Sequence, residues 1–480
     1  MRDNPEELNS WLDCIGTVNE ELKLELLPFL LGMILEKRKE DWYEEVVVKV
    51  IKIVVDLVNY KKEVSVQLLP LLVYKIASDR TPSVRLECLR ALPLMAKTKE
   101  NVPTIVSVLN KLKANKGAPT SFLIMLYTSL AETQVRCFPY LQEMLVDIGK
   151  PEDLKWELDI AKAVAVERIC EIRPTSHGLE LVSVISSILN RCGDKAGAVA
   201  TSVCVRSLAR LWRGAALAPH STWAALQPKL ARDNRHSVQI SICKLLSEVP
   251  TLRVSTPEFE RLVREAVAKL WGFIAEGNRP ELVEAACDAL ATYKIDDYTL
   301  KDVPEIYRKT VKLPASFCKT PADAARKPED VLDYVPCEIW PEVFKYTNQG
   351  ALLGVQRLAS RLIEREVRAY RSGVYQHDAR QEPSSLAHLH CTSVARALVE
   401  CFRRQATSPS YDYPEAVLLS ILQTLTAEYP KPLPPFDVCF TVELFPRGAA
   451  WRAGCVTLAA RQAQVAASAR RLLDGFLLAV

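Results

Sequence analysis

The sequence has few glycines. Only 16 of its 480 residues are glycine, about half of the usual share of roughly 7%. The tight turns and phosphate-binding loops of sheet enzymes depend on glycine, because it adopts left-handed backbone conformations without a steric cost. The local catalytic and nucleotide-binding signatures GxSxG, GxxxxGK[ST], HExxH and GxGxxG are absent as well. We therefore expect a protein that is not an enzyme and that binds no cofactor.

The chain also lacks the features of secreted and membrane proteins. Its 14 cysteines are spread from Cys14 to Cys455 without a CxxC pair, and most lie in apolar helical patterns, which is typical of free thiols in a reducing compartment. The first residues are polar and acidic where a secretory signal has an apolar run. The densest apolar run, Val46 to Val58, contains three charged residues and is too short to span a bilayer. We expect a cytoplasmic protein without a transmembrane helix.

The stretch from Val64 to Leu112 has the pattern of one helical hairpin followed by the start of another. Apolar residues at helical spacing run from Val64 to Ile76 and resume from Val84 to Met95. Between them, Thr81 is expected to be the N-cap and Pro82 the first residue of the second helix. Two amphipathic helices cannot bury both apolar stripes alone, so the pair needs neighbours to stack on.

Equivalent apolar positions recur along the chain at nearly constant intervals. The intervals are 38, 38, 39, 39, 38 and 44 residues, the period of two-helix solenoid repeats. The alternative is a compact bundle of evenly spaced helices, and six similar intervals argue against it. We therefore predict an all-α fold, an armadillo/HEAT-type α-solenoid of two-helix repeats with a period near 39 residues. Its repeat-core markers are Val54, Leu92, Leu130, Ile169, Leu208, Leu246 and Leu290.

Each repeat is expected to contain a kinked first helix and a straight second helix. The second helices are predicted at 45–58, 84–97, 122–133, 160–172, 200–212, 238–249 and 282–293. A proline marks the first helices, and inside a helix it costs roughly 3 kcal/mol unless packing compensates. Asp79 and Arg85 have the spacing of the charged ladder of HEAT units, although only this repeat has both residues. The marking prolines are Pro28, Pro70, Pro103, Pro139 and Pro228.

Three runs of the sequence closely resemble the focadhesin family. They are LELLPFLLGMILEKRKEDW, VSVQLLPLLVYKIASDRTPSVRLECLRALPLMAKTKENVPTIVSVLNKL and VAVERICEIRPTSHGLELVSVISSILNRCGDKAGAVATSVCVRSLARLW. The match is strongest from about Leu22 to Trp212 and continues to about Tyr346. The resemblance implies an armadillo-type fold and a cytoplasmic adaptor at focal adhesions, with vinculin or other adhesion proteins as partners. Because members of the family are much longer, we expect this chain to be a fragment or a truncated form.

The sequence predicts three regions. The solenoid covers residues 1–312, a proline-rich connection covers 313–345, and a further helical region covers 346–480 and continues the solenoid. The connection is too apolar for a free linker, so we expect it to pack, whereas 372–385 is polar and is predicted to be a mobile loop. Apolar faces predict further helices at 303–311, 390–405, 414–428 and 451–478. The prolines of the connection are Pro314, Pro321, Pro328, Pro336 and Pro341.

A long helix is predicted from Leu352 to Tyr370, with an apolar face that contains Leu353, Leu358, Leu362, Ile363 and Val367. The opposite face is rich in arginine, although the chain as a whole has a formal charge of only +4 and so no overall field for nucleic acid. Two interpretations stay open: a basic strip for an acidic partner, or a solvated face with interspersed glutamates. The strip consists of Arg357, Arg361, Arg365, Arg368 and Arg371.

One small cluster has the residue types of a metal site. It contains His388, His390 and Cys391, with His377 or Cys401 as further ligands. Two histidines at i and i+2 cannot share one helical face, so only a loop would bring them together, and we predict no metal. The leading functional hypothesis is a protein-interaction scaffold. The alternative is an α-solenoid scaffold for an RNA-processing, decay or transport complex, and an enzyme comes third.

Overall fold

The computed structural model describes residues 5–36, 41–115, 117–146, 154–252, 254–277, 279–318, 326–375, 386–408 and 412–479. These residues form helices joined by turns and short loops, and they contain no β-strand. The predicted all-α solenoid is confirmed. The chain divides into two compact units, Met1–Leu217 and Ala218–Val480.

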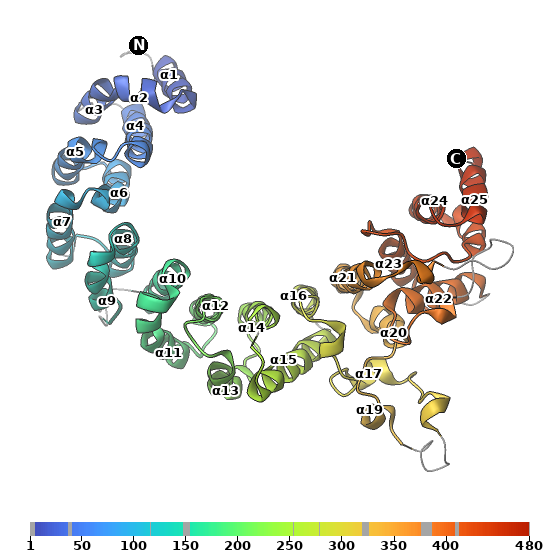
Figure 1. Cartoon of the computed structure of the whole chain (residues 1–480). Helices are drawn as coiled ribbons and strands as arrows, with labels where there is room; N and C mark the ends of the chain where they lie inside the picture. Colours follow the sequence, from blue (N-terminus) through green and yellow to red (C-terminus); the bar gives the residue numbers. More distant parts are fainter. Residues whose placement is uncertain are drawn as a thin grey trace. The chain divides into compact units, whose positions relative to one another are not determined.

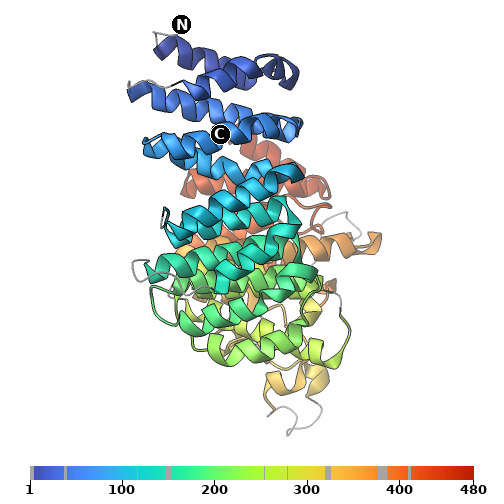
Figure 2. The same ribbon diagram turned by 90° about the vertical axis from the view of Figure 1, so that its left-hand side faces the viewer.

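The first unit is a stack of two-helix repeats in which the first helices form one row and the second helices another (Figures 1 and 2). The neighbouring second helices pack directly on one another along their row. The unit begins with α1 (Pro5–Thr17) and α2 (Glu20–Glu25). The first helices are α3 (Leu27–Leu35), α5 (Val64–Ser78), α7 (Val102–Ala114), α9 (Phe138–Val146) and α11 (Val182–Arg191). The second helices are α4 (Asp41–Tyr60), α6 (Pro82–Ala91), α8 (Thr120–Thr133), α10 (Lys155–Ile172) and α12 (Ala198–Arg213).

The second unit has an arrangement of the same kind on both sides of the proline-rich connection. Helix α16 packs on α21, α21 on α23 and α23 on α24, so the second helices form a row although about 60 residues separate α16 from α21. The row consists of α14 (His236–Leu246), α16 (Pro280–Leu290), α21 (Leu352–Ala369), α23 (Glu415–Thr426) and α24 (Ala449–Gln462). The helices beside it include α13 (Pro219–Leu230), α15 (Pro257–Glu276), α20 (Ile339–Tyr346), α22 (Val394–Thr407) and α25 (Ala467–Ala479).

The seven repeat markers all lie in the core, and none is more than 3% exposed. One of them is not in an α-helix. The predicted second helix 84–97 ends at Ala91, and a 3₁₀ segment, η1 (Leu92–Lys97), follows it. Pro93 is the cause, because a proline has no N–H for the α-helical bond and its ring clashes with the carbonyl four residues earlier. Leu92 is nevertheless completely buried at the start of this segment.

Most of the marking prolines do not kink their helices. Pro28 and Pro103 occupy the first turns of α3 and α7, and Pro139 is the second residue of α9. A proline at these positions loses no helical hydrogen bond, because the first N–H groups of a helix have no partner inside it. Only Pro70 and Pro228 lie inside helices, in α5 and α13. The prediction of a kink in every first helix was wrong.

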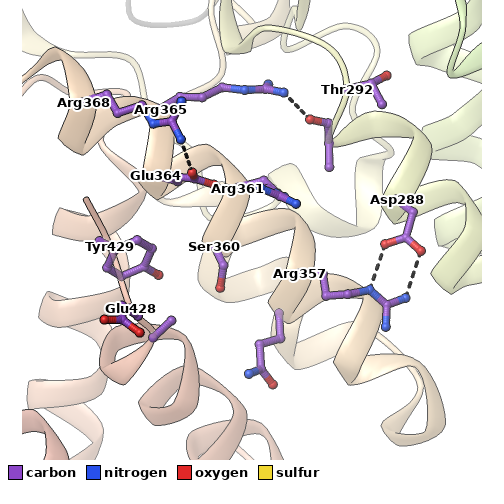
Figure 3. A pocket seen from close by; sticks show the side chains of 13 residues that line it. Asp288, Thr292, Arg357, Ser360, Arg361, Glu364, Arg365, Arg368, Glu428 and Tyr429 are labelled. Atoms are coloured by element: carbon purple, nitrogen blue, oxygen red, sulfur yellow. Dashed lines mark hydrogen bonds and ion pairs between the residues drawn. The ribbon is translucent and has the colours of Figure 1, made fainter. Parts of the chain in front are cut away.

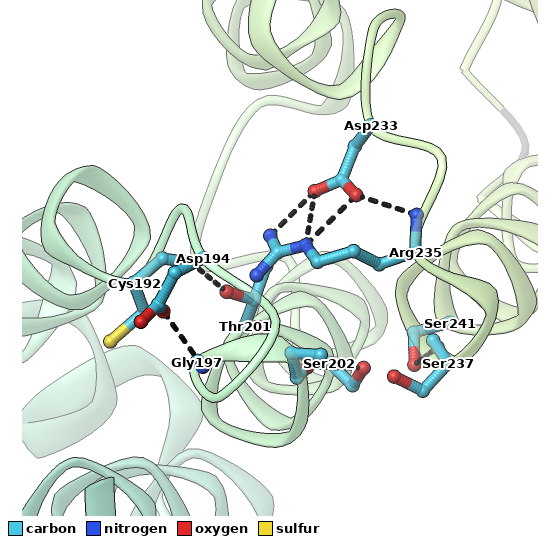
Figure 4. A network of polar contacts seen from close by, with 10 residues as sticks. Cys192, Asp194, Gly197, Thr201, Ser202, Asp233, Arg235, Ser237 and Ser241 are labelled. Carbon is cyan, nitrogen blue, oxygen red and sulfur yellow. Dashed lines mark hydrogen bonds and ion pairs between the residues drawn. The ribbon is translucent and has the colours of Figure 1, made fainter.

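The turns between paired helices use an aspartate to start the second helix. The Thr81 N–H donates to Asp79 Oδ1 at 3.0 Å, and Lys75 Nζ lies 3.1 Å from Asp79 Oδ2. In the second unit the Arg235 N–H donates to Asp233 Oδ1 at 3.0 Å, one residue before α14 begins (Figure 4). Thr81 is the N-cap residue, but its side chain makes no capping bond. The carboxylate of Asp79 therefore stabilises the turn that starts α6, instead of forming a ladder with Arg85.

In the turn before α12, an aspartate also accepts a hydrogen bond from a backbone N–H group. Asp194 Oδ1 accepts a hydrogen bond from the Gly197 N–H at 2.9 Å, and the Thr201 hydroxyl donates to the Cys192 carbonyl at 2.9 Å (Figure 4). An acidic side chain at a helix N-terminus satisfies orphan N–H groups and complements the positive end of the helix dipole. Three repeats thus begin their second helix next to an aspartate.

Acid should weaken the turn at Asp79. Burial raises the pKa of this carboxyl, but the hydrogen bonds from Thr81 and the ion pair with Lys75 outweigh it and hold the pKa below the ordinary 3.8. A lowered pKa contributes stability above the ordinary value, and that contribution is lost as the pH falls below it. We expect Asp79→Asn to lower the free energy of unfolding by about 1–2 kcal/mol at pH 7 and to cost progressively less below pH 4. Urea unfolding of the unaltered chain and the variant at pH 7 and below pH 4 tests this. A difference in the free energy of unfolding that does not change with pH would contradict it.

Four further sequence predictions were wrong in detail. Leu353 is 54% exposed instead of facing inward, because it lies on the α21 arc that carries the arginines. The predicted helix 451–478 is two helices, since α25 turns back onto α24 and buries Phe476 there. The predicted helix 303–311 contains only the short α17 (Glu305–Arg308), directly after Pro304. Helix α22 begins at Val394, because residues 390–393 form the turn before its N-cap Ser393.

The proline-rich connection packs within the second unit, against its other elements. Leu332, Val335 and Cys337 are buried in it, and Trp340 lies 6.1 Å from the ring of Trp271 in α15. The connection contains the short α19 (Pro328–Val331) and nearly all of α20, whereas α17 precedes it. Pro321 and most of the predicted loop 372–385 lie outside the described residues.

Candidate functional site

A groove of about 800 Å³ lies along α21 in the second unit, between α16 and the end of α23 (Figure 3). Four of the five predicted strip arginines line it: Arg357, Arg361, Arg365 and Arg368. Arg371 lies beyond the end of α21, is exposed, and is not part of the groove wall. The groove also contains the carboxylates of Asp288, Glu364 and Glu428. Its wall is therefore of mixed charge and not a uniform basic strip.

Arg357 connects α21 to α16. Its Nε and Nη2 atoms lie 2.8 and 3.0 Å from the two carboxylate oxygens of Asp288, and Nη2 also lies 3.1 Å from Glu284 Oε2 (Figure 3). The hydrogen bonds from Arg357 to Asp288 raise the pKa of its guanidinium. Two-pronged pairing of this kind fixes the orientation of an arginine. The side chain of Arg357 thus holds α16 and α21 together.

Arg365 caps the end of α16. Its guanidinium donates to the main-chain carbonyls of Ala291 and Tyr293, which follow the last turn of that helix. The same device recurs elsewhere: Arg173 donates to the carbonyls of Ala131 and Glu132 at the end of α8, and Lys431 donates to those of Arg368 and Tyr370 at the end of α21. Cations at helix C-termini satisfy orphan carbonyls and oppose the negative dipole end.

Of the four groove arginines, Arg361 and Arg368 have no partner on another helix among the interactions of the described residues. Both pair with Glu364 on their own helix, at 2.9 and 2.5 Å. Their side chains are 67% and 65% exposed. The hydrogen bond from Arg361, together with the charge of Arg368, lowers the pKa of Glu364. Two guanidinium groups therefore share one carboxylate, and this part of the groove keeps an excess positive charge.

A ladder of ion pairs joins successive second helices, and sequence reasoning missed it. Arg168 of α10 pairs with Glu132 of α8, and Arg206 of α12 pairs with Glu167 of α10 at 2.8 and 2.9 Å. Arg210 and Glu171 form a further pair at 3.2 Å. The Arg357 contact with α16 is the equivalent pair in the second unit. A recurrence of Glu and Arg at one repeat length, 36 or 39 residues, was the available signal.

No pair of this kind joins α21 to α23 among the described residues. Helix α23 has the sequence EAVLLSILQTLT, so Glu415 at its first position is its only charged residue. The Glu415 carboxylate is already used, because it accepts a hydrogen bond from Trp451 Nε1 at 2.7 Å. Glu428, beyond the end of α23, lies 3.9 Å from Arg461. The helix next to α21 in the row of second helices, α23, therefore has no carboxylate that pairs with Arg361 or Arg368.

The remaining groove groups are neutral hydrogen-bonding side chains. Gln356, Ser360 and Thr292 line it, as does Tyr429, whose hydroxyl donates to the Thr424 carbonyl at 2.6 Å. Burial raises the pKa of Tyr429 to about 12, so its phenol stays protonated at neutral pH. Among the residues that the structure describes, no histidine or cysteine lines the groove. Its chemistry is that of recognition through hydrogen bonds and charge.

Among the described residues of the predicted metal cluster, His390 and Cys391 are in contact, with Cys391 Sγ 3.9 Å from His390 Nδ1. His388 Nε2 is 3.0 Å from the Val374 carbonyl oxygen, and His390 Nδ1 is 2.7 Å from Thr392 Oγ1. Cys391 is exposed, Cys401 is buried in α22, and His377 lies outside the described residues. No group of three or more histidine, cysteine, aspartate or glutamate side chains in the described part of the chain is placed to hold a metal ion. In that same part, no helix is long and apolar enough to cross a membrane.

Comparison with known structures places the fold. The chain is similar to the karyopherin Kap121p in its complex with the SUMO protease Ulp1p, with a TM-score of 0.50 and 12% identity. The similarity covers 94% of this chain and 45% of Kap121p. At this level of identity the likeness concerns the fold alone, a solenoid of helical repeats.

Comparison with known sequences points to one family. Residues 69–290 match the family described as Focadhesin/RST1, DUF3730. Human focadhesin (Homo sapiens) is 26% identical over 68% of this chain, and zebrafish focadhesin (Danio rerio) is 28% identical over 64%. The aligned part of this chain spans only 18% and 17% of those two proteins. The predicted resemblance is confirmed: this chain is similar to focadhesins over about two thirds of its length.

Proposed function

We propose that this chain is a non-enzymatic protein-interaction scaffold and that the groove along α21 is one of its partner sites. The observation that carries this proposal is the groove itself, a concave surface on a row of stacked helices, lined by exposed arginines and neutral hydrogen-bonding groups. Solenoids typically bind extended or helical segments of other proteins on such surfaces. Kap121p, which shares the fold, is bound to a protein, Ulp1p.

The similarity to focadhesins supports a more specific role. We infer a cytoplasmic adaptor associated with focal adhesions, with vinculin or other adhesion proteins as partners. The aligned part of this chain covers less than a fifth of human focadhesin, so the proposal assigns to this chain only one stretch of an adhesion-protein binding surface.

A second candidate is a scaffold for an RNA-processing, decay or transport complex. The exposed Arg361 and Arg368 favour it, since arginine binds phosphate well. The three carboxylates of the same groove oppose it, because a polyanion that enters would meet Asp288, Glu364 and Glu428.

Proximity labelling in adherent cells separates the two candidates. The chain is compared with Arg361→Gln/Arg368→Gln, which leaves the structural Arg357 and Arg365 in place, and with Arg371→Gln as the control outside the groove. We expect enrichment of vinculin-layer adhesion proteins with the unaltered chain and the control. Enrichment of RNA helicases or exosome components, lost in the double variant, would replace the adhesion role by the second candidate.

A further inference from the structure

We propose that the groove along α21 binds an acidic, extended protein segment whose carboxylates pair with Arg361 and Arg368. The inference rests on the proposed function, because it names the class of partner for that site. It begins from the absence, in the described part of the chain, of an ion pair between α21 and α23. Arg168, Arg206 and Arg357 each have a carboxylate on the neighbouring second helix, whereas α23 has no free carboxylate for the arginines of α21.

The charge at this point is unbalanced. Arg361 and Arg368 share Glu364, so two positive groups face one negative group. Both arginines are about two thirds exposed, and their ion pairs lie within one helix, a class worth little in water. A partner carboxylate can therefore replace Glu364 on one arginine without breaking a contact that holds the fold together. The groove therefore has one carboxylate too few for its two exposed arginines, and a partner supplies the missing carboxylate.

The spacing of the arginines limits the shape of the partner. Arg361 and Arg368 are seven residues apart on one helix, which places them about 10 Å apart along its axis. A polyproline II segment rises about 3.1 Å per residue and has three residues per turn, so residues i and i+3 project from the same side about 9 Å apart. The fitting motif is thus two acidic residues three positions apart in an extended segment.

The neutral groups suit such a segment as well. An extended chain leaves its N–H and C=O groups unpaired. Ser360 lies near Arg361 in the groove wall (Figure 3), and Gln356 lines the same groove. Two isolated carboxylates can reach the arginines while the rest of the segment stays neutral and avoids Asp288 and Glu428. A nucleic-acid strand has a negative charge at every nucleotide and cannot do so.

Fluorescence anisotropy with synthetic 12-residue peptides tests the inference on the full chain. The probe is a labelled Pro/Ala/Ser peptide with two glutamates three positions apart, and the matched control has glutamine at both positions. We expect the glutamate peptide to bind about tenfold more tightly than the glutamine peptide. Arg361→Glu/Arg368→Glu should abolish that difference and favour a peptide with two lysines, whereas Arg371→Glu should leave it unchanged. Circular dichroism verifies that each variant is folded.

Glu364 gives a sharper test, because it competes with the partner for the same arginines. Glu364→Gln should strengthen binding of the glutamate peptide about threefold or more, whereas a purely structural role would predict no gain. Equal binding of the glutamate and glutamine peptides overturns the inference. So does tighter binding of a 12-nucleotide RNA that is lost in Arg361→Glu/Arg368→Glu.

The two proposals fail in different ways. If adhesion proteins are labelled equally by the unaltered chain and by Arg361→Gln/Arg368→Gln, and the glutamate peptide does not bind, the chain is a scaffold but the acidic-segment site is wrong. If the peptide binds as described but neither version enriches protein partners in cells, the recognition chemistry stands and the scaffold role is wrong.

Discussion

Leu92→Ala is expected to lower the free energy of unfolding of the first unit by about 2–5 kcal/mol. Leu92 is completely buried where α6 passes into η1, and η1 packs against α4, α5, α7 and α8. Removing three carbon atoms leaves a cavity among elements of three repeats. Pro93 restricts the backbone beside it, so the surroundings can collapse only partly into the space.

Urea unfolding followed by circular dichroism measures this loss as a lower midpoint of the transition of the first unit. Leu86→Ala is the matched control, because Leu86 lies in the adjoining α6 but is 37% exposed, and it should cost under about 1 kcal/mol. Because each repeat touches mainly its neighbours, the destabilisation should not spread evenly over both units. Equal effects of the two substitutions would show that the buried face of this repeat is misassigned.

Gly354→Leu should lower the free energy of unfolding of the second unit by about 3 kcal/mol or more. A Cβ atom at Gly354 would lie 2.8 Å from the Cα atom of Glu284, so the contact is with the backbone of α16 and cannot be relieved by a side-chain rotation. The substitution forces α16 and α21 apart, breaks the Arg357 bridge between them and opens the groove.

Gly272→Leu is the control for this prediction. Gly272 also lies inside a helix, α15, but a Cβ atom there would meet nothing within 4 Å. Replacing a mid-helix glycine in open space removes a helix-propensity cost of about 0.5–1 kcal/mol, so this variant should be neutral or more stable. Thermal unfolding of the two variants side by side gives the comparison, and a stable Gly354→Leu protein would mean that α16 and α21 do not pack closely.

The repeat was predictable because it is encoded in local periodicity. Val54, Leu130 and Leu246 each sit on an apolar stripe that recurs after a constant number of residues, and burial of that stripe drives the stacking. The end of α6 was predicted wrongly although its cause, Pro93, is visible in the sequence. There the apolar pattern continued through η1, and pattern alone does not distinguish an α-helix from a 3₁₀ segment of similar phase.

The groove was only partly predictable. All five strip arginines look alike in the sequence, since each follows helical spacing on the same face. The structure gives them different tasks, because Arg357 and Arg365 reach α16, which precedes them by about 70 residues, whereas Arg361 and Arg368 do not. Such assignments depend on which helix stacks next to α21, and the intervening connection hides that neighbour from any periodic analysis.

The caps at the ends of the second helices have a consequence for synthesis of the chain. Arg173 completes the end of α8 from 41 and 42 residues downstream, and Arg365 completes the end of α16 from more than 70 residues downstream. During translation α8 and α16 therefore emerge before the arginines that cap them and acquire these caps only after the downstream residues have been made. The delay is longer at α16, because the proline-rich connection must be made first.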